Sequence, residues 1–396
     1  MVLQDKRIVL GVTGGIAAYK AIEVCRRLMD AGAHVSPVLT EGALKMVTTT
    51  TFSALASEPA QTSLFDGPES IPHTTLGQQA DLVVIAPATA RVIGSYTAGI
   101  SDDLLTATLL ATRAPVLVCP AMHTEMWEHP AVQANLDTLR SRGVHVLDPE
   151  MGRLAGGDVG AGRLADPKAI VAEAMRVLGP NDFAGVDVVV TAGGTREPID
   201  PVRFIGNRSS GKQGHAIAAE AVSRGANVTL ITSVGADLPH GCDVVNVSTA
   251  AEMLAAVDKH ASADVVVMAA AVADFRPAAI EDSKIKKHEG IPEVVLEPTT
   301  DILAGLGAHK RPGQVIVGFA AETDDVDANA RRKLERKNAD MIVSNDVSAA
   351  QVGFGHDTNA VTIHLRDDTS REIGLRSKRD VARSVLDAVA ELRNQF

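Results

Sequence analysis

The chain has 396 residues, a formal net charge of −11, 45% hydrophobic residues and 3% aromatic residues, which predicts two domains with ample buried core. The acidic balance excludes general nucleic-acid binding, which needs a basic face, and no apolar run approaches the roughly 18 residues of a membrane span. Isolated cysteines at Cys25, Cys119 and Cys242, and a start without a signal peptide, indicate a soluble protein of the reducing cytoplasm.

The first half begins like a nucleotide-binding fold. Residues 7–32, "RIVLGVTGGIAAYKAIEVCRRLMDAG", have the pattern of a short buried strand, a Gly-rich turn and an amphipathic helix. Further strands are expected at residues 33–40, 80–89 and 114–122, and a closing helix at residues 166–180. Continuous apolar strands of this kind predict a parallel sheet that is covered on both faces.

The same pattern starts again at Asp187, with an insertion before the helix. Strands are expected at residues 227–232, 263–274, 314–323 and 339–347, followed by an antiparallel edge hairpin at 360–375. We expect a boundary near residues 180–186, which divides the chain into residues 1–182 and 183–396. The predicted class is α/β, with two Rossmann-like domains, each a mostly parallel sheet with helices on both faces. Ligands of such sheets bind at the carboxyl ends of the strands.

Gly14 and Gly15 lie where the first strand passes into the first helix. Glycines let backbone N–H groups approach a phosphate, and the N-terminus of a helix favours its negative charge. A Gly-Gly turn is equally often a plain chain reversal. Because the spacing is not G-x-G-x-x-G, a phosphate ligand here is expected to be a mononucleotide.

Other polar or small residues follow the later strands of this half. Thr40 follows one strand, and "APATAR" at residues 86–91 follows the next. "GISDDLL" at residues 99–105 begins like a helix cap, so Asp102 and Asp103 are as well explained by capping as by function. His73, in "SIPHTTL", would by itself be interpreted as a solvated loop residue.

Five segments in this order, "TGGIAAYK", "PHTTL", "APATA", "GISDDLL" and "PAMHTEMW", resemble the flavin-dependent cysteine decarboxylases. The resemblance implies bound FMN and a redox-neutral decarboxylation of 4'-phosphopantothenoylcysteine, with His73 as the active-site base. The residues it places near FMN are Gly14, Gly15, Ile16, Thr40, Ala88, Thr89, Ser101 and Asp102.

The first half departs from the family pattern at two positions. The family has P-x-M-N-x-x-M-W, with an Asn that binds the substrate carboxylate, where this chain has Met122 followed by His123. We expect His123 to donate to that carboxylate, against the alternative of a solvent-facing loop residue. In the Gly-rich flap, Gly156 replaces the cysteine that usually donates a proton, and Cys119 is better explained as a buried core residue.

The second half carries its own cluster of polar segments. "TAGGTREPIDPVRFIGNRSSGKQG", residues 191–214, is interpreted as a shaped anion-binding loop rather than a flexible one. Lys284 lies in the basic segment "SKIKKHEG", which could equally be a solvated face. Lys333 and Lys337 are four residues apart and so share one face of a helix, where surface lysines are common.

Taken in order, these segments resemble phosphopantothenate–cysteine ligase. The resemblance implies that CTP and Mg2+ activate 4'-phosphopantothenate as an acyl-cytidylate, and that L-cysteine then displaces CMP. By this resemblance, Lys284 is the essential active-site lysine, and Asn207 helps convert the acyl-cytidylate intermediate to product. The residues it places at substrate and nucleotide are Met122 in the first half and Gly193, Gly194, Ala270, Ala271, Asp274, Lys284, Thr300, Asp301, Ile302, Leu303, Phe319, Lys333 and Lys337 in the second.

The two resemblances together predict an enzyme that makes and then decarboxylates the same compound. They also imply a homo-oligomer, with trimer-based decarboxylase sites and dimeric ligase domains. Two other functions are considered: a regulatory flavoprotein that has lost activity through the changes at His123 and Gly156, and an NAD-dependent reductase. The presence of His73 and of a complete ligase half argues against the first, and only generic Gly-rich turns favour the second.

Overall fold

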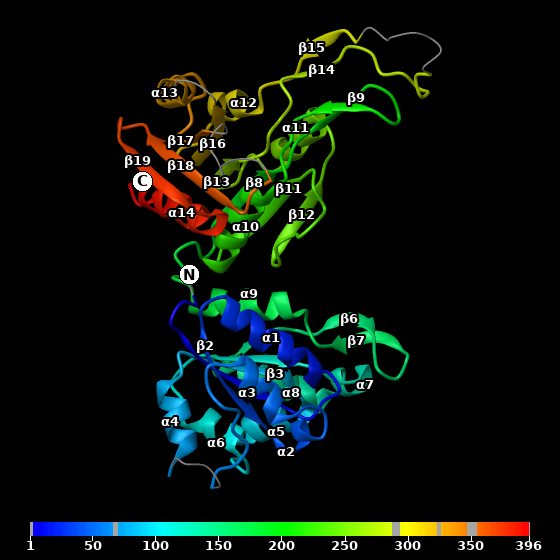
Figure 1. Cartoon of the computed structure of the whole chain (residues 1–396), viewed down its shortest axis with the longest axis vertical. Coiled ribbons are helices and arrows are strands. Elements are labelled where there is room, and N and C mark those ends of the chain that lie inside the picture. The colour runs from blue at the N-terminus through cyan, green and yellow to red at the C-terminus, as the bar shows by residue number, and fades with distance from the viewer. Residues whose placement is uncertain (1–2, 66–69, 287–293, 323–325, 347–354, 396) are drawn as a thin grey trace. The chain divides into compact units, whose positions relative to one another are not determined.

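The computed structural model describes residues 3–65, 70–286, 294–322, 326–346 and 355–395. The chain folds into two compact units, Met1–Pro180 and Asn181–Phe396 (Figure 1). Within the described ranges, no helix combines the length and apolar character needed to cross a membrane.

The first unit contains a parallel five-stranded sheet in the order β2-β1-β3-β4-β5. Its strands are β1 (Arg7–Val12), β2 (His34–Leu39), β3 (Leu82–Ala88), β4 (Val116–Pro120) and β5 (His145–Val146). A separate antiparallel hairpin pairs β6 (Glu150–Arg153) with β7 (Val159–Arg163). The order reverses direction between β1 and β3, which is where doubly wound sheets of this kind bind ligands.

Helices cover both faces of this sheet. They are α1 (Ala18–Asp30), α2 (Glu41–Leu44), α3 (Thr49–Leu55), α4 (Pro72–Gln79), α5 (Ala90–Ala98), α6 (Leu104–Ala111), α7 (Thr124–Trp127), α8 (Pro130–Ser141) and α9 (Pro167–Leu178). One buried cluster joins alternate strand residues such as Leu10 and Val84 to α1 and α9. The other joins Val9 and Val83 to α4, α5, α6 and α8.

The second unit contains an eight-stranded sheet in the order β12-β11-β8-β13-β16-β17-β18-β19. Its strands are β8 (Asp187–Ala192), β11 (Asn227–Thr232), β12 (Cys242–Asn246), β13 (Val265–Met268), β16 (Val315–Glu322), β17 (Met341–Asp346), β18 (Thr358–Leu365) and β19 (Ser370–Ser377). The pairs from β12 to β17 are parallel, and β18 and β19 add an antiparallel edge. The order reverses between β8 and β13, which marks the expected ligand crevice.

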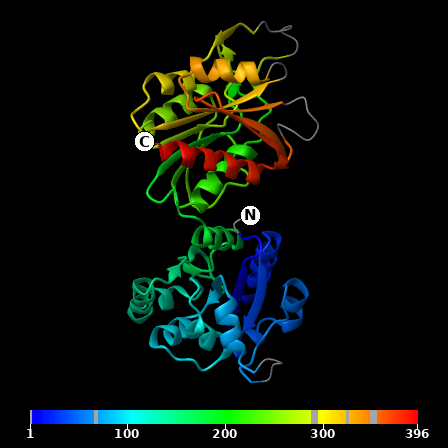
Figure 2. The same cartoon turned by 90° about the vertical axis from the view of Figure 1, so that its left-hand side faces the viewer.

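The helices of the second unit also form two layers, visible in Figures 1 and 2. They are α10 (Lys212–Ser223), α11 (Ala250–Lys259), α12 (Ile302–Ala308), α13 (Val326–Arg336) and α14 (Lys378–Arg393). One buried cluster packs α10 and α14 on the sheet, and the other packs α11, α12 and α13. Two short ribbons extend from this body: β9 (Arg196–Pro198) with β10 (Phe204–Gly206), and β14 (Phe275–Pro277) with β15 (Leu296–Pro298).

The predicted α/β class with mostly parallel sheets is confirmed, and the hairpin at the sheet edge is antiparallel as expected. One predicted strand was too long. The apolar segment 263–274 is a strand only as far as Met268, and residues 269–274 leave the sheet to line a pocket. Alanine and valine continue the apolar pattern past the strand end, so the sequence does not mark where the sheet stops.

Candidate active sites

The turn after β1 lies at the reversal point of the first sheet and packs tightly against its surroundings. A Cβ atom on Gly14 would lie 2.6 Å from the carbonyl carbon of Gly42, so only glycine fits this backbone contact. A Cβ atom on Gly15 would lie 3.5 Å from Thr89 and 4.0 Å from the carbonyl oxygen of Ala121. The turn therefore adjoins residues that follow β3 and β4.

Side chains of this edge are fixed by hydrogen bonds to neighbouring strands. The Thr13 hydroxyl donates to the carbonyl oxygen of Pro87 (2.7 Å) and accepts from the N–H of Thr89 (3.0 Å). Thr40 caps α2 by accepting from the N–H of Ala43 (3.3 Å). Ala88 is buried at the end of β3, and the side chain of Thr89 makes no capping bond to α5. The edge thus holds a rigid set of small residues beside the glycine turn.

His73 is a helical residue rather than the loop residue that its sequence context suggested. It lies in the first turn of α4, which begins with Pro72. Its Nδ1 atom is buried and has no hydrogen-bond partner among the described residues. A buried polar atom without a partner is costly, so it marks a position where a ligand or another subunit is expected to contact the ring.

His123 lies at the N-cap of α7, in the loop that follows β4. Its ring is held between two carboxylates: Nδ1 contacts Glu125, and Nε2 lies 3.1 Å from Oδ2 of Asp158. The hydrogen bond and the charge of Glu125 raise the pKa of His123, and Asp158 adds to the effect. The ring is therefore biased toward the imidazolium form, which donates from both nitrogens.

The β6–β7 hairpin packs on this loop (Figure 1). The N–H of Met122 donates to the carbonyl oxygen of Gly162 (2.9 Å), and the Thr124 hydroxyl donates to that of Ala161 (2.8 Å). Cys119 is fully buried in β4, as expected for a core residue, and burial raises the pKa of its thiol.

In the Ser-Asp-Asp segment before α6, the two aspartates make different interactions. Asp103 caps α6 by accepting from the N–H of Thr106 (2.8 Å), and the two residues form a reciprocal capping box. Asp102 is exposed and forms an ion pair with Arg91 (3.2 Å), while Ser101 is exposed in the preceding loop. Capping therefore explains Asp103, whereas Asp102 takes no part in the cap and pairs with Arg91 at the surface.

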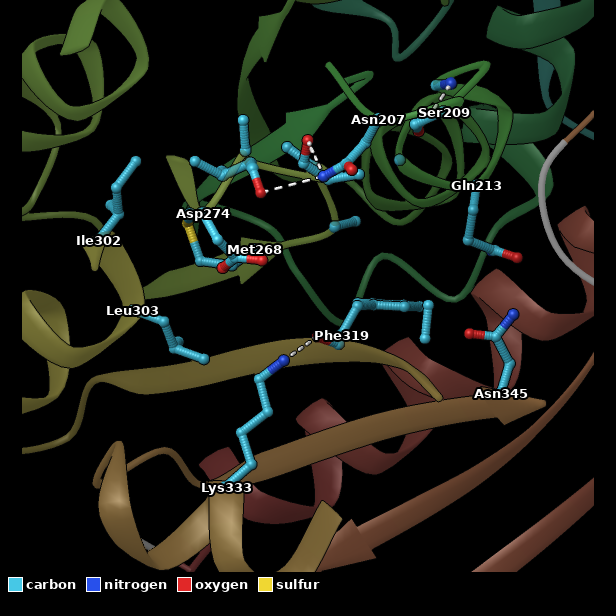
Figure 3. A pocket seen from close by; sticks show the side chains of 18 of the residues that line it. Asn207, Ser209, Gln213, Met268, Asp274, Ile302, Leu303, Phe319, Lys333 and Asn345 are labelled. Carbon is cyan, nitrogen blue, oxygen red and sulfur yellow. Dashed lines mark hydrogen bonds between the residues drawn. The ribbon is translucent and has the colours of Figure 1, made fainter. Parts of the chain in front are cut away.

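The second unit contains a cavity of about 550 Å³ at the reversal point of its sheet (Figure 3). It collects residues that the sequence predicted from five separate segments. These are Asn207, Ala270, Ala271, Asp274, Thr300, Asp301, Ile302, Leu303, Phe319, Lys333 and Lys337.

Asn207 and the Gly-rich turn after β8 pack against the end of β13. The Asn207 side chain donates through Nδ2 to the carbonyl oxygens of Ala271 (3.3 Å) and Val272 (3.1 Å). A Cβ atom on Gly194 would lie 2.4 Å from the carbonyl oxygen of Asn207, and Gly194 also forms a bridge with Ala271. Gly193, with a φ of +87°, makes the turn behind them. Gly193 and Gly194 thus form a turn behind the pocket wall and do not line the pocket themselves.

Two lysines from the end of α13 enter this pocket. Lys333 donates to the carbonyl oxygen of Phe319 (2.9 Å; Figure 3), and Lys337 forms an ion pair with Asp301. Burial lowers the pKa of Lys337, and the negative charge of Asp274 partly opposes this shift. Asp301 also caps α12 by accepting from the N–H of Ala304 (3.0 Å). The pocket thus presents cations on one wall and Asp274 on another.

Lys284 is absent from the lining of this pocket. It is exposed in the segment after β14, where the next residue, Ile285, donates through its N–H to Asp200 (3.2 Å) and accepts from Arg203 (3.2 Å). The structure therefore places Lys284 beside the β9–β10 ribbon rather than with the other predicted ligase residues of the same chain.

Several polar residues that the sequence analysis did not select also line the pocket: Gln213, Asn345, Asn359 and Lys378. Asn345 follows the same rule as the residues that were selected, since it lies near the carboxyl end of a parallel strand. Lys378 begins α14, far along the chain, and its burial together with the charge of Lys212 lowers its pKa. Its place in the pocket depends on the packing of α14 against α10, which no local motif encodes.

Two family models match the chain. The "Flavoprotein" model covers residues 2–179, and the "DNA/pantothenate metabolism flavoprotein C-terminal domain" model covers residues 183–392. A solved structure of the C-terminal domain of a coenzyme A biosynthesis bifunctional protein is 40% identical, with a TM-score of 0.47, and covers 55% of this chain and 100% of its own.

Curated relatives match almost the whole chain. The coenzyme A biosynthesis bifunctional protein CoaBC of Mycobacterium tuberculosis (strain H37Rv) is 51% identical, covering 97% of this chain and 96% of the relative. Proteins of the same name from Bacillus subtilis (strain 168) and Escherichia coli (strain K12) are 45% and 44% identical, and each match covers at least 98% of both chains. The resemblances found in the motifs of both halves are thereby confirmed. The chain belongs to the family of coenzyme A biosynthesis bifunctional proteins, with a flavoprotein domain followed by a DNA/pantothenate metabolism flavoprotein C-terminal domain.

Proposed function

We propose that this protein carries out two successive reactions of coenzyme A biosynthesis: phosphopantothenate–cysteine ligation and phosphopantothenoylcysteine decarboxylation. Ligation takes place in residues 183–396 and decarboxylation in residues 1–182. The observation that carries the proposal is identity of 44–51% over nearly the full chain to bifunctional relatives. The strand order reverses once in each of the two sheets, and ligands of such sheets bind at the reversal point. Two separate sites in one chain are therefore supported.

In the ligase reaction, the carboxylate of phosphopantothenate attacks the α-phosphate of CTP, and pyrophosphate leaves. The amine of cysteine then attacks the acyl-cytidylate and releases CMP. Both partners of the first step are anions, so positive charge must lie close to where they meet. Lys333 and Lys337 supply that charge at the pocket wall, and the buried ends of Ile302 and Leu303 offer an apolar surface to the nucleotide.

Mg2+ enters this reaction with the nucleotide. Within the described ranges, no group of three or more His, Cys, Asp or Glu side chains is arranged to hold a metal ion. Protein sites for Mg2+ commonly supply one or two carboxylates and leave the rest to substrate phosphates and water. Asp274, which is exposed and lines the pocket, is the carboxylate that we assign to this task.

The first unit offers FMN a site of the right chemistry. The turn at Gly14 to Ile16 leads into the start of α1, and the N-terminus of a helix suits a phosphate. Thr40, Thr89 and the buried Ala88 lie at the ends of the strands on either side of β1. When bound, the flavin supplies an acceptor for the electrons of the cysteinyl thiol and later returns them, so the reaction consumes no external reductant.

His73 acts as the base of this reaction, and His123 binds the substrate carboxylate. The unpartnered Nδ1 of His73 supports the first role, because no hydrogen bond within the described residues commits this nitrogen as a donor or an acceptor. The raised pKa of His123 supports the second, because an imidazolium makes a charge-assisted hydrogen bond to a carboxylate. We propose that Met122, which precedes His123 and packs partly on the core, flanks the same substrate position.

The protein acts as a homo-oligomer of the cytoplasm. Ile16 and Tyr19, beside the glycine turn, are 64% and 61% exposed, which suits a trimeric contact at the decarboxylase site. Phe204, Phe275 and Leu296 on the two ribbons are also exposed, which suits a dimeric contact of the ligase domains. Lys284 lies beside the β9–β10 ribbon, and we propose that this contact carries it to the pocket of another copy. The three unpaired cysteines fit a reducing compartment.

Two measurements on the purified protein test the proposal. The protein should be yellow, with the absorption band of FMN, and should release pyrophosphate from CTP only when phosphopantothenate is present. A colourless protein that binds FMN neither during expression nor on addition would overturn the flavin assignment. Pyrophosphate release that ignores phosphopantothenate would overturn the ligase assignment.

A further inference from the structure

The last step of the proposed decarboxylation requires an acid beside the substrate. Once carbon dioxide has left, the substrate is an enethiolate, and two additions convert it to the saturated product. The carbon that carried the carboxylate gains a proton, and the sulfur-bearing carbon gains a hydride. FMN bound in the first unit would supply the hydride, because it would have taken up two electrons from the thiol earlier in the cycle, so the reaction lacks only a proton donor.

Cysteine thiols do not provide that acid in the first unit. Cys25 and Cys119 are both fully buried, in α1 and β4. Burial raises the pKa of the Cys25 thiol to about 11 and that of the Cys119 thiol still further. Neither sulfur can contact a ligand at the strand ends without opening the core.

The ring of His123 occupies the space where a side chain at position 156 would lie. A Cβ atom built on Gly156 would be 3.2 Å from Nε2 of His123 and 3.3 Å from Oδ2 of Asp158. Both distances are tighter than an ordinary carbon contact, so an imidazole at 123 and a side chain at 156 compete for the same volume. Glycine at 156 lets the ring approach the hairpin turn.

The loop that carries this ring is fixed in position. Gly160 and Gly162 of β7 let the hairpin approach closely, because Cβ atoms there would lie 2.2 Å from the Thr124 hydroxyl and the Met122 carbonyl oxygen. The loop also begins at Ala121, whose carbonyl oxygen adjoins the glycine turn after β1. His123 therefore lies two residues from the edge at which the flavin is proposed to bind.

We propose that Nε2 of His123 donates the proton that completes the reduction. This role rests on the proposed function, in which the same N–H first holds the substrate carboxylate. When carbon dioxide leaves, that N–H faces the carbon that has lost it. The N–H bond then breaks, a C–H bond forms at that carbon, and neutral imidazole remains. Glu125 holds the other nitrogen, and Asp158 holds Nε2 in the structure without substrate.

The variant His123→Asn separates the two tasks of the ring. An amide can bind a carboxylate, but it is not an acid at neutral pH. In single turnover, the variant should release carbon dioxide and bleach the flavin band, and then accumulate the unsaturated thiol. Steady-state turnover should fall about 10²- to 10⁴-fold, the usual contribution of a general acid. Mass analysis of the thiol and absorption of the flavin are the two readouts.

The outcomes are distinct. Full conversion to the saturated thiol at the wild-type rate would overturn the donor role. So would a variant that keeps its flavin yet releases no carbon dioxide, since His123 would then act only before that step. If the wild-type protein itself released no carbon dioxide, the proposed function would fail, whatever the variant does.

A rescue experiment uses the space for which the His123 ring and a side chain at position 156 compete. In the background of His123→Asn, the substitution Gly156→Cys places a thiol where the imidazole was, and we expect it to restore at least part of the lost turnover. Gly156→Ser in the same background is the matched control, with similar size but no comparable acidity. Equal activity of the two double variants would count against proton donation as the missing function.

A second variant changes the acidity of the ring without removing it. Glu125 and Asp158 are the charged groups that act on the ring, and both raise its pKa. Glu125→Gln should therefore lower the pKa of His123. The alkaline limb of the pH–activity profile, where the ring loses its proton, should move to lower pH. NMR titration of the His123 ring, which does not depend on turnover, should move in the same direction. If the pKa of the ring measured by NMR changes while the alkaline limb of the pH–activity profile does not, the proposal is contradicted.

Discussion

Gly14 and Gly15 are neighbours in one turn, yet the structure gives them different constraints. A methyl group on Gly14 would meet backbone of Gly42 at 2.6 Å, whereas one on Gly15 would meet Thr89 at an ordinary 3.5 Å. We expect Gly14→Ala to lower the free energy of unfolding by about 1–3 kcal/mol, the usual cost of overpacking. Gly15→Ala should fold as well as the wild type. Denaturant unfolding of both variants checks this difference, and equal stability would contradict the tight contact.

Asn207 fixes a loop that lines the proposed ligase pocket, because its amide donates to two backbone carbonyls. Asn207→Asp replaces these donors with a carboxylate that repels both carbonyls and an anionic intermediate. We expect pyrophosphate release to persist, while amide formation with cysteine slows about 100-fold, because the loop loses its anchor and gains a negative charge where the proposed anionic intermediate must be stabilised. Rapid-quench measurement of both products tests the order of events. Normal amide formation would assign Asn207 to loop structure alone, and Asn207→Ala is the uncharged control.

At the scale of elements, the start of α6 tests which acidic residue is structural. Asp103 makes the capping box, while Asp102 makes an exposed ion pair with Arg91. We expect Asp103→Ala to lower the free energy of unfolding by about 1 kcal/mol, the usual value of an N-cap. Asp102→Ala should change it by less than about 0.5 kcal/mol, as is usual for surface positions. Thermal unfolding of the pair measures the contrast, which equal losses would refute.

The strands and the residues at their carboxyl ends could be predicted, because both are set by short continuous stretches of sequence. Continuous apolar runs such as residues 82–88 mark buried parallel strands, and polar residues directly after them mark a ligand edge. The contact between His123 and Gly156 could not be predicted, because it depends on how the β6–β7 hairpin packs on α7. Lys378 was missed for the same reason, since α14 brings it to the pocket from the far end of the unit.

At the scale of the whole molecule, the two proposed active sites belong to separate compact units. We expect Lys284→Gln to abolish ligation and leave decarboxylation of supplied phosphopantothenoylcysteine intact, because the lost charge serves only nucleotide chemistry. His73→Asn should do the reverse and keep its FMN. Each activity is assayed alone with its own substrate. A single substitution that silenced both activities in a folded protein would contradict two separate sites.

In the proposed function, one chain makes a compound and then decarboxylates it. The most direct measurement supplies the purified protein with phosphopantothenate, CTP, Mg2+ and cysteine, and counts pyrophosphate, carbon dioxide and phosphopantetheine together. We expect the three products to form in equal amounts, and omission of CTP or cysteine to abolish carbon dioxide and phosphopantetheine. Pyrophosphate and phosphopantothenoylcysteine formed without carbon dioxide, from protein that carries its flavin, would show that the chain does not catalyse both reactions.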